Sequence, residues 1–307
     1  AAVPIGKEFV KAVFSQCHMP FYYLYLKFFI HYFGNGDLML RLTSVLAGVL
    51  SIVSMYFVGK EAKDEKLGIL CASMTALSSF LIYFSQEVRF YSLLFLFSSL
   101  SLIFTLKLCK QQTLPVAIGY IISSFLVIFT HTLGFVFVFF NLVFISFCLL
   151  KKDKYKKTII MVWGSLLLLT IINLPLLNRI FSSHPLSQWW GHFTLSRIGF
   201  LITDYFSPVL TNIVSAPDKF FYKTSLSFLI FFLVSPIIAI VGTIRALMTK
   251  KYEILGLFYI CLAFILFLIV LAISGKLLFI TKYSIEIYPI LILIVGYGLL
   301  ELKKEWR

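Results

Sequence analysis

The chain has 307 residues, of which 60% are hydrophobic, 18% are aromatic and only 13% are charged, and its mean hydropathy is +0.97. A soluble domain of this size needs more polar cover than that, so the composition excludes the soluble class. The apolar runs of about 17 to 22 residues fit α-helical spans and not the alternating pattern of a membrane β-barrel. We therefore predict an all-α, polytopic integral membrane protein.

The net charge of +14 comes mostly from short Lys clusters between apolar runs, as at residues 59–66, 107–110 and 151–157. Such clusters are typical of cytoplasmic loops, so they predict a multi-pass protein of the cell (inner or plasma) membrane. They do not indicate a nucleic-acid partner, and membrane lipids are the expected surroundings. The five cysteines form no CxxC pair, so neither a disulfide framework nor a zinc site is predicted.

In chain order, the first predicted element is an interfacial helix at residues 20–33, which is too short and too interrupted to span. About nine spans follow it. They are predicted at residues 40–58, 67–84, 91–108, 115–131, 133–150, 158–177, 225–247, 254–273 and 278–300. We expect one transmembrane domain over residues 1–307, with an outer loop at 1–39 and an extracytoplasmic loop segment at 178–224.

Glu87 and Arg89 lie in a very short predicted outer loop between two long apolar runs. An ionisable pair at the end of a hydrophobic segment indicates a functional site in a membrane protein. The alternative is a solvated loop in which Glu87 caps a helix and Arg89 extends its charge to the interface.

Other polar residues fall on the same predicted face: Asp37 and Arg41 at the first span, His131 in a tight turn, and Lys282 and Glu286 near the last span. Each has a structural alternative. Asp37 and Arg41 have the i,i+4 spacing of a helix pair, and Lys282 and Glu286 share that spacing and would neutralise each other. A lone interfacial His is often structural.

Five short motifs occur in order at residues 18–23 (HMPFYY), 34–44 (GNGDLMLRLTS), 83–93 (YFSQEVRFYSL), 130–134 (THTLG) and 282–289 (KYSIEIYP). At these motifs the sequence resembles the polytopic, polyprenyl-phosphate-sugar-dependent glycosyltransferases with the GT-C fold. The resemblance is to the branch of protein O-mannosyltransferases and lipid A aminoarabinose transferases (glycosyltransferase family 39). One departure is Lys282, where the family usually has Arg, because a point charge then replaces a bidentate phosphate fork.

The resemblance also implies an acidic pair in a first outer loop, upstream of the motif that begins at His18, with its Asp as the catalytic base. Nothing acidic precedes His18 except Glu8, whose surroundings do not match. We therefore expect that the chain is N-terminally truncated, that an upstream span and the base are missing from it, and that it is inactive alone.

The function that the resemblance implies is transfer of a sugar from a polyprenyl-phosphate-linked donor to an extracytoplasmic lipid, glycan or protein acceptor, by an inverting single displacement. Such a reaction needs a carboxylate for the acceptor's proton and cations for the departing phosphate. The implied catalytic residues are Glu87 and Arg89, and the implied substrate-binding residues are His18, Tyr22, Arg41, His131, Lys282 and Tyr283.

No metal site and no certain cofactor are predicted, and a divalent-metal requirement stays open. A polytopic transporter or flippase for lipid-linked sugars is the main alternative, and it predicts broken helices with charges near the bilayer midplane. A non-catalytic assembly scaffold is a third possibility. Neither the sugar nor the acceptor is specified by these motifs.

Overall fold

The computed structural model describes residues 19–149, 156–182, 226–248, 251–274 and 281–305. Within these ranges the regular structure is helical and contains no strand, which confirms the predicted all-α class. Residues 1–18, including the predicted substrate-binding residue His18, lie outside the described residues, as does most of the predicted loop segment 178–224.

The helices follow the order of the predicted elements, and the predicted interfacial helix is α2. Their bounds are α2 Phe21–Phe33, α3 Asp37–Ala62, α4 Glu65–Leu77, α5 Ser79–Gln86, α6 Tyr91–Lys110, α7 Leu114–Thr130, α8 Gly134–Leu149, α9 Lys156–Ser182, α12 Leu226–Met248, α13 Tyr252–Ile273, the 3-10 helix η3 Thr281–Ile287 and α14 Tyr288–Glu305. Helix α9 extends beyond its predicted end, so residues 178–182 are helical and not loop.

Five helices are long and apolar enough to cross a membrane: α3, α6, α9, α13 and the segment from η3 into α14. A sixth span is possible if α4 and α5, bent by 57° at Ser78, count together. Helices α7 and α8 have 17 and 16 residues, fewer than the roughly 20 that a straight span needs. The described residues thus confirm a multi-helix membrane protein but not the number of nine spans.

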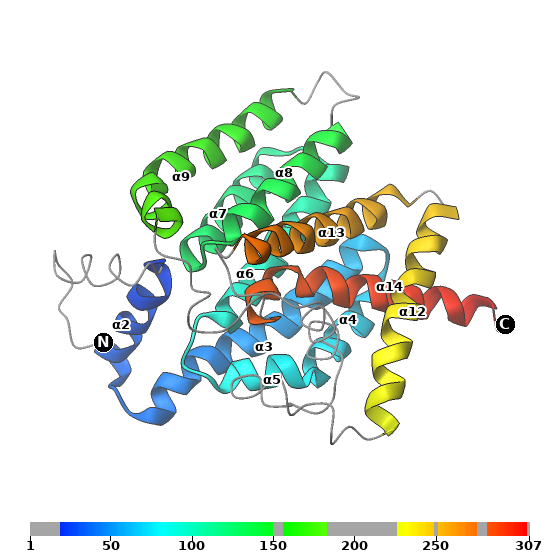
Figure 1. Cartoon of the computed structure of the whole chain (residues 1–307), viewed down its shortest axis with the longest axis horizontal. Helices are drawn as coiled ribbons and strands as arrows, with labels where there is room; N and C mark the ends of the chain where they lie inside the picture. Colours follow the sequence, from blue (N-terminus) through cyan, green and yellow to red (C-terminus); the bar gives the residue numbers. More distant parts are fainter. Residues whose placement is uncertain (1–18, 150–155, 183–225, 249–250, 275–280, 306–307) are drawn as a thin grey trace.

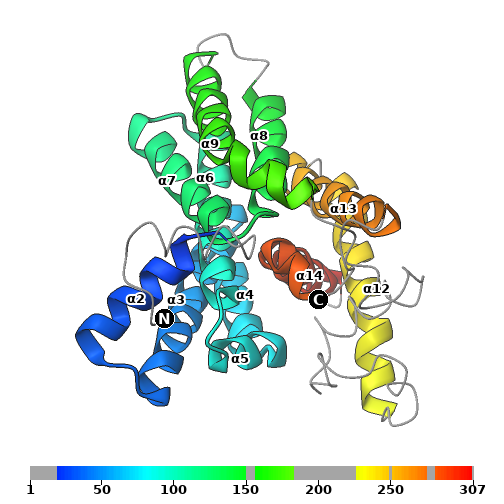
Figure 2. The same ribbon diagram turned by 60° about the vertical axis from the view of Figure 1, so that its left-hand side comes forward.

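Helices α6 and α14 are the most enclosed of the candidate spans, whereas α9 is the most exposed. Helix α3 packs along α4 and α6, and α14 contacts α4, α6, α12 and α13. Figures 1 and 2 show α14 (red) between the α3–α6 group and the α12–α13 pair. Helices α6 and α14 lie at the centre of the bundle. The segments that precede them, the α5–α6 loop and η3, lie at the same end of it.

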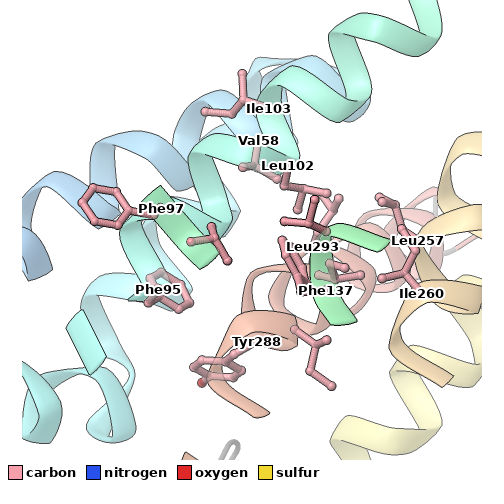
Figure 3. Packing of buried hydrophobic residues seen from close by; sticks show 14 of the residues in the cluster. Val58, Phe95, Phe97, Leu102, Ile103, Phe137, Leu257, Ile260, Tyr288 and Leu293 are labelled. Carbon is pink, nitrogen blue, oxygen red and sulfur yellow. The ribbon is translucent and has the colours of Figure 1, made fainter. Parts of the chain in front are cut away.

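The core between these helices is apolar and aromatic, as Figure 3 shows. Aliphatic and aromatic side chains from α3, α6, α8, α13 and α14 meet there, among them Val58, Phe95, Leu102, Phe137, Leu257, Ile260, Tyr288 and Leu293. In lipid such packing stabilises the bundle by van der Waals contact, because lipid tails are as apolar as the core itself.

The break between α4 and α5 is made by Ser78, whose hydroxyl accepts a hydrogen bond from the Leu81 amide and caps α5. The same hydroxyl lies 2.9 Å from the Tyr288 hydroxyl at the start of α14. Serine side chains at a helix N-terminus replace the missing intrahelical acceptor. Beyond the bend, Phe80 of α5 packs on the Tyr288 ring at 5.4 Å between centroids, so α5 lies against the start of α14.

Candidate functional site

The loop between α5 and α6 carries the two residues predicted to be catalytic. The carboxylate of Glu87 accepts a hydrogen bond from the Tyr83 hydroxyl at 2.6 Å, and its second oxygen lies 3.9 Å from Arg89 Nε. The Ser44 hydroxyl of α3 donates to the carbonyl of Glu87 at 2.6 Å and lies 3.4 Å from that of Arg89. The loop is therefore held from α3 and α5, while the side chain of Arg89 is 59% exposed.

Glu87 is the C-cap residue of α5, but its carboxylate does not cap the start of α6, as the structural alternative would require. Phe90 is the N-cap of α6 and makes no side-chain cap hydrogen bond, and the described partners of the Glu87 carboxylate are Tyr83 and Arg89. A carboxylate held between a phenol and a guanidinium is fixed in position beside the cation.

Arg41 supports this loop from outside. Its Nη1 donates to the Gln86 carbonyl at 2.8 Å, and its Nε lies 3.5 Å from Asp37. The i,i+4 pair expected as the structural alternative is thus present, but both side chains are exposed, and such pairs contribute little to stability. Arg41 holds the C-terminus of α5 in place.

His131 and Glu286 form the second part of the site. Nδ1 of His131, at the C-terminus of α7, lies 2.7 Å from Oε1 of Glu286 in η3, and the Glu286 side chain has no exposed surface. Glu286 therefore pairs with His131 and not with Lys282, contrary to the i,i+4 alternative. Burying an ionisable group without a partner is costly, so the imidazole compensates for this carboxyl.

Aromatic rings join the two parts. The ring of Phe90 stacks on His131 at 5.2 Å between centroids, and the ring of Tyr283 lies nearly parallel to His131 at 6.1 Å. Tyr22 of α2 meets the edge of Phe90 at 6.3 Å. A continuous series of rings thus connects α2, the α5–α6 loop, the α7–α8 turn and η3. We refer to Tyr22, Glu87, Arg89, Phe90, His131, Lys282, Tyr283 and Glu286 as the outer cluster.

Charge is concentrated in the outer cluster. Lys282 interacts electrostatically with Arg89, which repels it, and with Glu87, which attracts it. Partial burial lowers the pKa of Arg89, but Tyr91, Glu87 and Tyr83 outweigh it, so its pKa lies above the ordinary value. Burial raises the pKa of Tyr22 and Tyr23, which keeps both phenols neutral. Two cations and neutral hydroxyls therefore lie near one partly exposed carboxylate, Glu87.

Of the residues predicted from the sequence, Tyr22, Glu87, Arg89, His131, Lys282 and Tyr283 come together in the outer cluster, and Arg41 lies beside it. Reasoning from single residues missed Ser44, Tyr83 and Phe90 as supports and Glu286 as the partner of His131. Ser44, Tyr83 and Phe90 all fall inside the quoted motifs, which was the available signal.

The outer cluster has groups suited to an anion and a polar, ring-shaped ligand: two cations, phenol hydroxyls and aromatic faces. Two of its buried oxygens, Tyr22 Oη and Glu286 Oε2, have no hydrogen-bond partner among the described residues. Such atoms would be satisfied by hydroxyl donors. No group of three His, Cys, Asp or Glu side chains that could hold a metal occurs within the described ranges.

Comparison with known proteins identifies no relative: no protein-family model matches the sequence, and no curated protein matches it.

Proposed function

We propose that this protein is a membrane glycosyltransferase that moves a sugar from a polyprenyl-phosphate-linked donor to an acceptor on the extracytoplasmic face. The observation that carries the proposal is the convergence of residues from four separate motifs in one cluster. Arg89, His131 and Lys282 come from the α5–α6 loop, the α7–α8 turn and the start of the last span, and Tyr22 comes from α2.

The chemistry of the transfer explains these residue types. The bond between the sugar's anomeric carbon and the phosphate oxygen breaks, and the electron pair leaves with the polyprenyl phosphate. A bond from the acceptor oxygen to the opposite face of that carbon forms, and the acceptor's proton passes to a carboxylate base. Arg89 and Lys282 stabilise the charge that develops on the departing phosphate, and Glu87 orients Arg89.

The resemblance implies a carboxylate base upstream of the motif that begins at His18, and residues 1–18 lie outside the described residues. The described residues supply the groups suited to donor binding and leaving-group stabilisation. The helix α2 carries Tyr22, Tyr23 and Tyr25 along with exposed aromatic side chains, as is typical of a helix at the membrane interface. A donor whose polyprenyl tail remains in lipid would place its phosphate at the membrane interface, level with α2.

A flippase for lipid-linked sugars is the second candidate, because two observations favour it. Helices α4 and α5 are bent by 57° at Ser78, and η3 is kinked at Ser284 before α14 begins. Discontinuous helices are common in transporters. The cations, however, gather at the ends of the helices, at the α5–α6 loop and at Lys282, rather than along a path through the bundle, which supports the enzyme.

The proposal is tested with the full-length gene product in membranes supplied with radiolabelled polyprenyl-phosphate sugars. We expect Arg89→Ala to reduce release of label from the lipid by about 100-fold or more, since one electrostatic contact to a developing anion contributes about that much. Arg89→Lys should retain part of the activity. Lys66→Ala, a matched loss of one exposed cation in α4, should leave transfer unchanged. Full activity of Arg89→Ala would overturn this role for Arg89.

A further inference from the structure

Glu286 has an unusual environment for a carboxyl group. Its side chain has no exposed surface, and among the ion pairs of the described residues no other carboxylate is so completely enclosed. Oε1 contacts His131 Nδ1 at 2.7 Å, whereas Oε2 has no hydrogen-bond partner within the described part of the chain. A half-satisfied buried carboxylate is costly, so a role in stability alone does not account for it.

The other buried polar side chains of the described bundle are neutral, apart from Glu301, which is paired with Lys63. Thr105 bonds to Asn141 between α6 and α8, and Ser78 bonds to Tyr288 between the α4–α5 break and α14. These pairs do not require an ionisable group. The fully enclosed Glu286 therefore stands out, and the ring of its partner His131 stacks on Phe90, the residue that follows Arg89.

His131 is constrained on three sides. Phe90 stacks on its ring, Tyr283 lies nearly parallel to the ring, and Glu286 engages Nδ1. The side chain remains 14% exposed. When one imidazole nitrogen is held by a carboxylate, the ring orientation and the tautomer are fixed, and the other nitrogen is presented to a ligand. In this chain that nitrogen is Nε2.

We infer that Glu286 is a positioning residue of the sugar-transfer site, which fixes His131 through Nδ1 so that Nε2 contacts the phosphate–sugar group bound by Arg89 and Lys282. This inference rests on the proposed function. In this arrangement His131 contacts the reacting end of the donor, and Glu286 acts only through His131.

The test is a double-mutant cycle on transfer from the labelled donor, with Glu286→Gln, His131→Ala and the double variant in the full-length gene product. Glu286→Gln keeps the size of the side chain and removes its charge. We expect it to lower kcat by about 10- to 100-fold, as is usual for a residue that orients a ligand-contacting His, with little change in the donor KM. The double variant should be no slower than His131→Ala, because Glu286 has no effect without the imidazole.

Tyr288→Phe is the matched control, because it removes a buried hydroxyl two residues from Glu286 and bonded to Ser78. It should leave kcat within about twofold, since its role is in packing. The elution profile and melting temperature in detergent are measured for each variant. If Glu286→Gln loses the fold while His131→Ala keeps it, Glu286 serves stability and the inference is wrong.

Wild-type kcat in Glu286→Gln, or effects of the two single variants that multiply, would also overturn the inference while the proposed function stands. If the wild type releases no label from any polyprenyl-phosphate sugar, the proposed function itself fails, and this inference fails with it. The release of label by the wild-type protein in the same assay therefore distinguishes the two failures.

Discussion

At the scale of single residues, Ser44 links the framework to the loop that carries Glu87 and Arg89. Its hydroxyl is buried and donates to the Glu87 carbonyl at 2.6 Å, with the Arg89 carbonyl at 3.4 Å. The side chain that holds the loop therefore belongs to α3, whereas the charges belong to the loop itself. This separation allows a test of loop geometry that leaves every charged group in place.

We predict that Ser44→Ala lowers transfer by about tenfold, because the Glu87 and Arg89 carbonyls lose a donor and the loop is less well fixed. The free energy of unfolding should fall by about 1 kcal/mol, the usual effect of one such hydrogen bond. Ser165→Ala in α9, which removes a bond within one helix to the Val162 carbonyl, is the control. Activity and melting temperature are compared for both; equal effects of the two substitutions would contradict the role of Ser44.

Also at this scale, the sequence predicted which residue types gather but not all of their partners. Arg89 and Lys282 were predicted from their positions at the ends of apolar runs. The contact of His131 with Glu286 joins residues 155 positions apart and depends on how η3 packs against the α7–α8 turn. The i,i+4 spacing predicted Lys282 as the partner of Glu286. In the tertiary structure Glu286 contacts His131 instead.

At the scale of helices, α12 and α14 cross at two glycines. A Cβ added to Gly298 would lie 2.3 Å from the Ile238 carbonyl oxygen, and one added to Gly242 would lie 2.9 Å from the Cα of Gly298. Such close backbone approach is typical of membrane helix pairs with small residues at the interface. The position of α14, which follows directly after η3, depends on this contact.

We predict that Gly298→Ala lowers the stability of the protein by about 1–3 kcal/mol, the usual cost of overpacking, although alanine favours helices more than glycine does. Gly164→Ala in α9, where an added Cβ meets nothing within 4 Å, should be neutral or stabilise by up to about 1 kcal/mol. Thermal unfolding in detergent measures both. A Gly298→Ala protein as stable as the wild type would mean that α12 and α14 do not cross in this way.

The points at which the helices begin and end were only partly predictable from the sequence. The hydropathy of residues 67–84 predicts one span, yet Ser78 ends α4 and caps α5 within it. Two adjacent serines in an apolar run were the signal for this break. Helices α7 and α8, with 17 and 16 residues, are close in length to the spans predicted at 115–131 and 133–150, so their shortness was already visible in the sequence.

At the scale of the whole molecule, the two ends of the bundle carry different sets of charged residues. The Lys-rich end includes the pair Lys63–Glu301, at 2.6 Å, which ties the α3–α4 turn to α14, whereas the outer cluster lies at the other end of α3, α6 and α14. An all-helical membrane protein with this polarity was predictable from composition and charge. The enclosure of α6 and α14 was not, because both have the same mean hydropathy of 1.9 as the exposed α9, and hydropathy does not distinguish lipid from protein neighbours.

The most direct test of the proposed transferase follows the sugar in proteoliposomes that contain the purified full-length gene product, an acceptor extract and a polyprenyl-phosphate donor labelled in the sugar. For a transferase we predict that label leaves the lipid and becomes attached to the acceptor, with inverted configuration at the anomeric carbon. Label that crosses to the other leaflet while still attached to the lipid would contradict it and would identify a flippase.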